Sequence, residues 1–220
     1  MESQVRGGTR WKRFAVVMVP SVAATACIGV ALAQGALAAS FSVSGQQFKV
    51  TADTLHGEGF AQYGAIDSGY TLDGKKTAHP VAVSSFQDAS ITNMCQSVVT
   101  PDVPFFGSVT LRLEAGGKGH DAVQAHNLYI DVDDLNADAT FNNIDIGVAA
   151  GDTAKAKGGK GPGMKGGGEA ANPFGFAQQA ESADLTHVHQ TAWATTAGTF
   201  KLSGLHMSLH KGDGKGIECY

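Results

Sequence analysis

Four histidines have the residue type and spacing of a metal site. His187 and His189 are two residues apart, so on a strand they share a face, and His206 and His210 share a face on a second strand. If the two strands pair, four imidazoles can bind Zn²⁺ or Cu²⁺. Residues 190–200 contain no carboxylate, which argues against a cupin-like site. Ordinary outward-facing histidines remain the competing interpretation, and no motif predicts a bound cofactor.

Aspartates are concentrated in one segment of the chain. They are Asp131, Asp133, Asp134, Asp138 and Asp145. Calcium prefers such oxygen ligands, but the spacing of an EF-hand and its closing glutamate are absent. We therefore expect solvated strand edges, where charge opposes sheet-to-sheet aggregation.

Serine chemistry has no sequence motif here. No serine lies in the G-x-S-x-G pattern of the hydrolase nucleophile elbow. A triad is defined by geometry and not by order, so the catalytic residues stay unknown at this point. The serines to inspect for a neighbouring histidine are Ser68, Ser84, Ser85 and Ser203, and we expect none of them to form a triad.

Alternating apolar and polar residues predict short β-strands with one buried face. The clearest run is 128–132. It ends at Asp133-Asp134, a second run ends at Asn142-Asn143, and both pairs are predicted corners. Similar layouts begin near residues 48 and 185. The pattern predicts an all-β fold, either β-solenoid-like or a two-layered β-sandwich of short strands, and an ordinary antiparallel sandwich explains it equally well.

One short helix is also predicted. Asn172 and Pro173 have the residue types of an N-cap and a first helical position, so a helix toward Ala183 is expected.

The N-terminus has the pattern of an export signal. Four basic residues precede the uncharged stretch 14–33, and Ala36-Leu37-Ala38 fits the A-x-A cleavage pattern. We expect a signal peptide over 1–38 and a mature β-rich domain over 39–220. Two alternatives stay open: an uncleaved membrane anchor over 14–33, which is long enough to span, and a lipoprotein modified at Cys27.

Composition excludes several classes of protein. Hydrophobic residues make up 43% of the 220 residues, which is too many for a disordered chain. Residues 39–220 contain 12 basic and 19 acidic residues, a net charge of −7, so nucleic-acid binding is not expected. Glycine occurs 29 times, roughly twice its usual share, which indicates many tight turns.

Two cysteines remain after the signal, Cys95 and Cys219. An even pair in an exported domain predicts one disulfide. The bond would fix a C-terminus that otherwise frays, with about 5 kcal/mol as the upper figure of the chain-entropy model. Two unpaired thiols are the alternative.

Residues 151–173 form a segment of low complexity that is rich in glycine and lysine. It contains eight glycines and four lysines, a composition that cannot bury a core and predicts a flexible loop. A basic arm for an anionic partner and a solvated linker are both compatible with it.

The chain as a whole resembles a family of exported, membrane-associated actinobacterial proteins. The segments that carry the resemblance are Arg10-Trp11-Lys12-Arg13, Ala36-Leu37-Ala38-Ala39-Ser40-Phe41-Ser42-Val43-Ser44-Gly45, Leu55-His56-Gly57-Glu58-Gly59-Phe60, Leu202-Ser203-Gly204-Leu205 and Cys219. Some members carry the label cholesterol esterase, and their genes neighbour that of a small integral membrane protein. Because no acid, base and nucleophile form a coherent set, we expect an exported cell-envelope protein with a non-catalytic binding or structural role, located outside the cell or on its surface. Its expected partner is that small integral membrane protein or an envelope lipid. An ester hydrolase is the alternative, and the family has no catalytic residues to match.

Overall fold

The computed structural model describes Met18, residues 43–155 and residues 169–220. Over the two long ranges the regular elements are β-strands, apart from the 3₁₀ turn η1 at Ala150–Asp152. The all-β prediction is confirmed. The predicted export segment 1–38, except Met18, and residues 156–168 of the predicted glycine–lysine loop lie outside the described residues.

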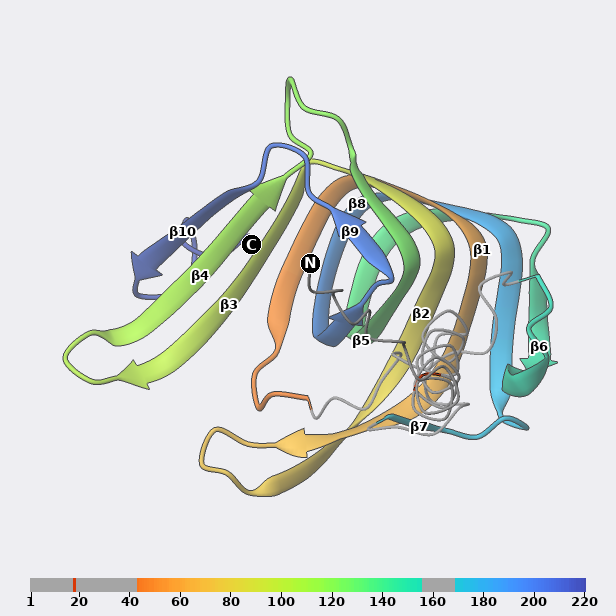
Figure 1. Ribbon diagram of the computed structural model, residues 1–220, viewed down its shortest axis with the longest axis horizontal. Coiled ribbons are helices and arrows are strands. Elements are labelled where there is room, and N and C mark those ends of the chain that lie inside the picture. Colours follow the sequence, from red (N-terminus) through yellow and green to blue (C-terminus); the bar gives the residue numbers. More distant parts are fainter. Residues whose placement is uncertain (1–17, 19–42, 156–168) are drawn as a thin grey trace, which may run out of the picture. The chain divides into compact units, whose positions relative to one another are not determined.

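Ten strands belong to one antiparallel sheet (Figure 1). Their bounds are β1 Phe48–Tyr70, β2 Lys76–Thr92, β3 Met94–Val103, β4 Gly107–Ala115, β5 Val123–Asn142, β6 Asp145–Ala149, β7 Glu169–Ala171, β8 Phe176–Thr196, β9 Thr199–Lys201 and β10 His206–Lys211. The strand order is β10-β4-β3-β1-β2-β5-β8-β6. The short strand β7 pairs with β1, and β9 pairs with β5.

A further pairing between β1 and β8 closes β1, β2, β5 and β8 into a four-stranded barrel. The expected stack or sandwich of short strands is thus realised as long strands of one closed sheet, and β1 alone has 23 residues. The predicted corner at Asp133-Asp134 is an irregularity inside β5, where the register against β8 shifts. A shift of register looks the same in the sequence whether the strand turns or bulges.

Backbone kinks let the long strands bend around the barrel. Left-handed φ values occur at Gly59 (64°), Asn127 (50°) and His187 (52°). Core residues on either side of the last two kinks are three apart and not two: Ala125 and Leu128, and Leu185 and Val188. Each kink therefore reverses which face of the strand points inward.

The interior of the barrel combines small side chains with large apolar ones. The buried alanines of the core cluster include Ala52, Ala89, Ala125, Ala180, Ala183 and Ala192. Among the larger residues, the ring of Phe60 packs against Phe86 and Phe141, with centroid distances of 5.4 and 5.0 Å. The Phe86 ring lies directly over the backbone of Gly57, where no side chain would fit.

The predicted helix at Asn172 is wrong. Asn172 Oδ1 accepts a hydrogen bond from the Phe174 amide at 3.0 Å, and the Gly175 amide donates to the Asn172 carbonyl at 2.9 Å. These bonds close a β-turn, after which β8 begins. Asparagine and proline are common at the start of turns as well as of helices. The residues that follow form β8 because they pair with β1 and β5, so the turn forms and the helix does not.

Strands β3, β4 and β10 extend the sheet beyond the barrel. Strand β3 pairs with β1 only over residues 49–51, and β10 pairs with β4 at the outer edge. The chain end returns along this extension, because Thr110 Oγ1 donates to the Gly212 carbonyl at 2.7 Å. Over the described ranges, no helix has the length and apolarity that crossing a membrane requires.

The close contact between Gly57 and Phe86 predicts a large cost for Gly57→Ala. A Cβ atom at Gly57 would lie 2.1 Å from Phe86 Cδ1, so the ring must move. We expect the free energy of unfolding to fall by about 1–3 kcal/mol in urea titrations. The matched control is Gly64→Ala on the same strand, where a Cβ meets no atom within 4 Å. Equal effects of the two substitutions would contradict the packing described for the barrel.

Candidate functional site

The structure does not bring the four predicted metal ligands together. Strand β10 borders only β4, whereas β8 borders β1, β5 and β6. Each histidine has its own neighbour: His187 Nδ1 lies 3.0 Å from Asp138 Oδ2, the His189 ring meets the Tyr220 ring edge-on at 4.9 Å, His206 Nδ1 lies 3.6 Å from Glu114 Oε2, and His210 Nε2 lies 2.9 Å from Ser208 Oγ. Within the described ranges, no group of three or more His, Cys, Asp or Glu side chains could hold a metal ion. A four-histidine site stays a prediction of the sequence alone.

Cross-strand histidine–carboxylate pairs, which sequence reasoning missed, lie on the exposed faces of the barrel strands. His56 Nδ1 is 2.6 Å from Asp184 Oδ1, and its Nε2 is 3.1 Å from Glu58 Oε1. The hydrogen bond with Asp184, against a smaller opposing effect of burial, raises the pKa of His56 above its ordinary value. His126 and Asp88 are direct neighbours in the β2–β5 register and form a second pair at 2.8 Å. Register, and not sequence spacing, brings these partners together.

Two aspartates are buried outside the main core cluster. Asp67 is 1% exposed and Asp131 is 5% exposed. The expectation of a solvated edge is therefore wrong for Asp131. The kink at Asn127 explains this burial, because it turns Tyr129 and Asp131 away from the barrel interior. There Tyr129 joins a second apolar cluster with Ala150.

Burial raises the pKa of Asp67, and this effect outweighs a hydrogen bond with Asp131 and the nearby charge of His79. A hydrogen bond between two carboxyl groups requires a proton on one of them. The raised pKa favours the protonated form of Asp67, which can donate the hydrogen bond to Asp131. Among the described residues, Asp67 Oδ2 has no hydrogen-bond partner.

An imidazole lies next to this pair. His79 is the direct neighbour of Asp67 in the β1–β2 register, and its ring stacks on Trp193 with a centroid distance of 3.6 Å. Its Nε2 lies 3.3 Å from Thr77 Oγ1. Because both carboxyl groups are buried, they offer almost no surface on which a substrate could lie.

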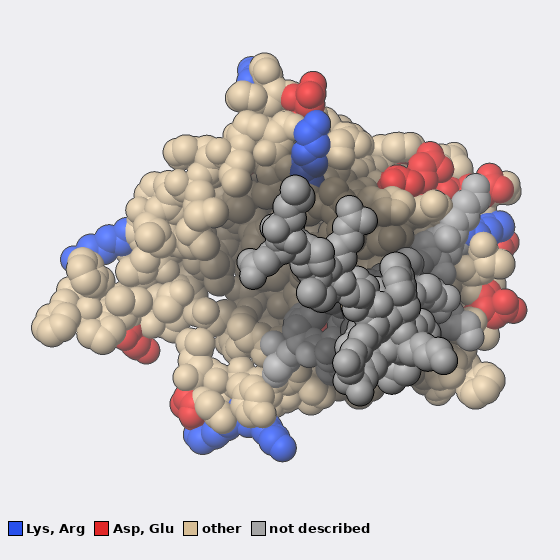
Figure 2. All heavy atoms as spheres, viewed as in Figure 1, with Lys and Arg blue, Asp and Glu red and all other residues tan. Residues whose placement is uncertain are grey.

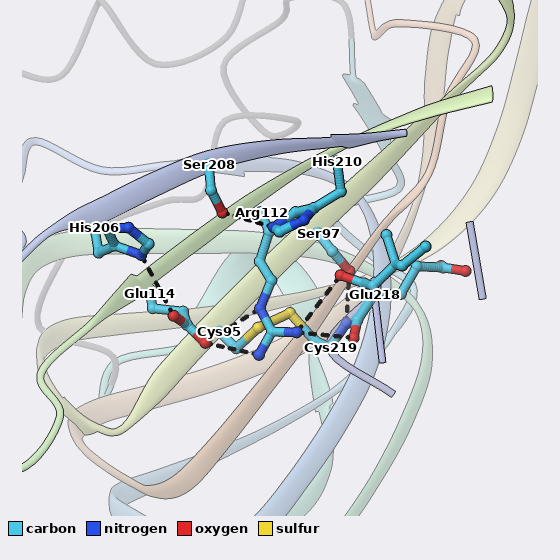
Figure 3. Close-up of polar contacts among 10 residues, drawn as sticks. Cys95, Ser97, Arg112, Glu114, His206, Ser208, His210, Glu218 and Cys219 are labelled. Atoms are coloured by element: carbon cyan, nitrogen blue, oxygen red, sulfur yellow. Dashed lines mark hydrogen bonds and ion pairs between the residues drawn. A yellow bond between two sulfur atoms is a disulfide. The ribbon is translucent and has the colours of Figure 1, made fainter. Parts of the chain in front are cut away.

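A serine–histidine contact occurs on β10 (Figure 3). Ser208 and His210 alternate with exposed apolar residues on this edge strand, and their side chains meet at 2.9 Å. The nearby Glu114 contacts His206 and Arg112 instead. A triad needs a carboxylate on the second imidazole nitrogen, and no interaction among the described residues places one at His210. The alternation of two polar residues on one strand is the signal that could have indicated this pair.

The other serines have different roles. Ser84 Oγ accepts a hydrogen bond from Gln62 Nε2 at 2.9 Å inside the barrel, and Ser85 Oγ donates to the Ala61 carbonyl at 3.2 Å. The Ser203 carbonyl accepts from the Gly116 amide in a turn, and Ser68 lies exposed on β1. Ser84, Ser85 and Ser203 thus make contacts within the fold, and none of these contacts is with a histidine.

A disulfide and several hydrogen bonds join the C-terminus to β3 and β4 (Figure 3). The predicted disulfide between Cys95 and Cys219 is present, and the Cys219 amide donates to Ser97 Oγ at 3.1 Å. Arg112 donates to the carbonyls of residues 217 and 218 at 3.5 and 3.3 Å. Its second contact, with Glu114 at 2.7 Å, lowers the pKa of that carboxyl group. These bonds make the junction a structural feature.

Two cavities lie within the barrel, each of about 30 Å³. Both are bordered by Leu55, Ile130, Val188 and the buried Gln190. A cavity of this size holds a water molecule or two, whereas sites for drug-sized ligands span about 300–1,000 Å³. Neither cavity accommodates an acyl chain or a sterol.

Comparison with known proteins gives one match. The model of a family of unknown function, DUF6230, matches residues 44–220. No curated protein and no solved structure matched the chain.

The buried acid pair predicts an effect of Asp67→Asn on the pH dependence of stability. A raised pKa in the folded state gives stability that is complete below the ordinary aspartate pKa and is lost as pH rises through the raised value. Asparagine cannot ionise but can still donate to Asp131. We expect the variant to be more stable at pH 7, on the order of 1 kcal/mol, and less sensitive to pH. Melting curves from pH 3 to about 8 test this, with Asp121→Asn in an exposed loop as the control. A variant that melts like the control at every pH would contradict the raised pKa of Asp67.

Replacing both cysteines tests the C-terminal junction without creating a free thiol. Because the bond closes a loop with a sequence separation of 124, we expect Cys95→Ser with Cys219→Ser to cost about 2–5 kcal/mol of unfolding free energy. Denaturant titration measures the loss, and limited proteolysis should remove the released C-terminus first. Two alkylated thiols in the unreduced natural protein would contradict the bond.

Proposed function

The chain belongs to the family of unknown function DUF6230, and we propose that this member is an exported cell-envelope protein with a non-catalytic binding role. Its proposed location is the outer surface of an actinobacterial cell. Its proposed partner is an envelope lipid or a small integral membrane protein.

The disulfide supports export. Such bonds form and persist in oxidising compartments and are rare in the cytosol. The bond between Cys95 and Cys219 joins distant parts of the mature domain, as expected of a structural disulfide. The basic residues and apolar stretch of the N-terminal sequence agree with this location, either as a cleaved signal or as an anchor.

One observation carries the binding role: the buried acid pair and the exposed serine–histidine pair lie on different strands and do not form one site. The Asp67–Asp131 pair is buried, at 1% and 5% exposure, and lies on β1 and β5. The exposed Ser208–His210 pair lies on β10, at the far edge of the sheet. Nucleophilic catalysis requires the nucleophile, its base and an orienting group within hydrogen-bond reach of one another. A binding protein requires none of these.

An ester hydrolase is the second candidate, and the 2.9 Å contact between Ser208 and His210 is the observation that favours it. A serine with an adjacent base can act as a nucleophile, although a dyad without an acid is weak. The cavities of about 30 Å³ inside the barrel offer no room for a lipid ester, so a substrate would have to lie on the surface of β10.

An activity assay with Ser208→Ala separates the two candidates. We expect the protein to hydrolyse neither short-chain nor long-chain esters above the buffer rate and to take up no fluorophosphonate probe. Ser208→Ala should therefore be indistinguishable from the natural protein, as should the control Ser68→Ala. Stoichiometric labelling and turnover that disappear in Ser208→Ala, but persist in Ser68→Ala, would overturn the binding role in favour of a hydrolase.

A further inference from the structure

Large apolar side chains are exposed on three separate connections of the sheet. They define an aromatic rim, with the exposed fraction of each residue as follows: Tyr70 49%, Leu72 59%, Phe105 99%, Phe106 58%, Phe174 89% and Phe176 65%. Single exposed apolar residues are ordinary on a protein surface, but a group of them marks an interaction site.

The long strand β1 brings the three connections to the same side of the molecule, because it bends over between its two ends (Figure 1). Strand β3 is antiparallel to β1 and pairs with its start at residues 49–51, so the β3–β4 turn lies beyond that start, whereas the β1–β2 turn lies at the other end of β1. Strand β8 is antiparallel to β1 and begins beside its second half, where Ala177 pairs with Tyr63. Figure 1 shows the β1–β2 turn, the β3–β4 turn and the start of β8 along the lower side of the view.

The β3–β4 turn holds a phenylalanine in a strained conformation. The Phe106 amide donates to the Val103 carbonyl at 3.0 Å, and Phe105 has φ 69° at the third position of this turn. That position favours glycine or asparagine, because a bulky side chain at positive φ is costly. The strain holds Phe105 almost fully in solvent, where it gains no contact with the fold. Strain of this kind occurs at functional sites.

The turn before β8 repeats the arrangement. Pro173 and Phe174 occupy the middle of the turn that the Gly175 amide closes on the Asn172 carbonyl at 2.9 Å. Phe174 is again exposed at the tip. Two Pro-Phe turns thus present aromatic rings on one side of the molecule.

The opposite side of the molecule differs in chemistry. Its connections include Asn93 and residues 116–122, which contain three glycines, Lys118, His120 and Asp121 but no large apolar residue. Leu205 also lies there and is 47% exposed, so this side has an exposed aliphatic residue, but the two connections contain no Phe, Tyr or Trp.

We propose that the aromatic rim inserts into the interface of a lipid bilayer; this rests on the proposed export of the protein and names the lipid as its partner. Phenylalanine and leucine are typical of segments that insert at the boundary between lipid headgroups and acyl chains, and tyrosine is enriched at that boundary. Three separate tips suit shallow insertion into a fluid surface better than a flat protein face, whose contact needs a continuous patch.

The charge pattern makes insertion, and not electrostatic capture, the source of binding. Lys75 and Lys76 follow Leu72 in the β1–β2 turn, but Lys75 forms an ion pair with Asp73. Figure 2 shows lysine or arginine side chains on the lower side of the view, where Figure 1 places this turn. With a net charge of −7 over residues 39–220, the domain is not drawn to anionic lipid as a whole.

Flotation with lipid vesicles tests the proposal on the natural protein in its processed form. We expect it to float with phosphatidylcholine vesicles and with vesicles that also contain phosphatidylglycerol, and to remain bound at high salt, because apolar insertion is not screened. Phe105→Ser with Phe106→Ser should weaken partitioning at least about tenfold. Leu205→Ser, the matched control on the opposite side, should leave it unchanged.

Two further variants separate insertion from a general loss of folding. Phe105→Asn relieves the positive φ, so it should reduce vesicle binding while the melting temperature stays equal or rises. Phe105→Trp should keep the binding and shift its emission to the blue when vesicles are added.

Each outcome decides the proposal. No flotation of the natural protein, equal losses in the rim and control variants, or binding that needs anionic lipid and disappears with salt would each overturn insertion by the rim. N-terminal sequencing of the processed protein tests export independently, with a start near Ala39 expected for a cleaved signal. An exported protein that does not bind vesicles would refute membrane insertion by the rim and leave the proposed function standing. A protein retained in the cytosol would refute the proposed function. Because all variants share one processed form, any anchor at 14–33 contributes equally to each.

Discussion

Closure of the sheet with only four strands is the constraint on which the rest of this structure depends. Eight strands leave a barrel just wide enough for ordinary side chains, so four strands leave far less room. The interior accordingly includes alanines such as Ala180 and Ala192, which are fully buried. Gly57 leaves room for the Phe86 ring, because a side chain at this position would collide with it. Small residues, which weaken an ordinary strand, thus make space here for the large apolar side chains of the core.

The same closure requires strands that are long and bent. Residues at positive φ, such as Asn127 and His187, reverse the inward face of a strand in its middle. One length of β5 therefore supplies Leu128 to the barrel core, while Asp131 is buried away from it. The burial of the acid pair is thus a consequence of how the strand bends. Burial raises the pKa of Asp67, so protonation of this carboxyl group lowers the cost of removing the pair from water.

The sequence predicted what depends on local pattern. Period-two alternation indicated an all-β fold, and two cysteines in a domain predicted to be exported indicated the bond between Cys95 and Cys219. It could not distinguish a corner from a bulge at Asp133-Asp134, because both shift the register of apolar residues. The helix expected at Asn172 failed for a related reason, since the choice between helix and strand lay with distant partners. Pairs such as His56 with Asp184 depend on register between strands that are far apart in the sequence.

The division of the surface follows from these elements. Turns at one end of an antiparallel sheet need not pack against anything, so their residues are free of the demands of the core. There a strained Phe105 can persist, because the rest of the hairpin is held by β3–β4 pairing that the turn does not disturb. The C-terminal junction, with Arg112 and the disulfide, holds the same hairpin in place from its other side. Strands β3, β4 and β10 thus support the exposed apolar turn at Phe105. The packing of the barrel provides stability that offsets the strain of that turn.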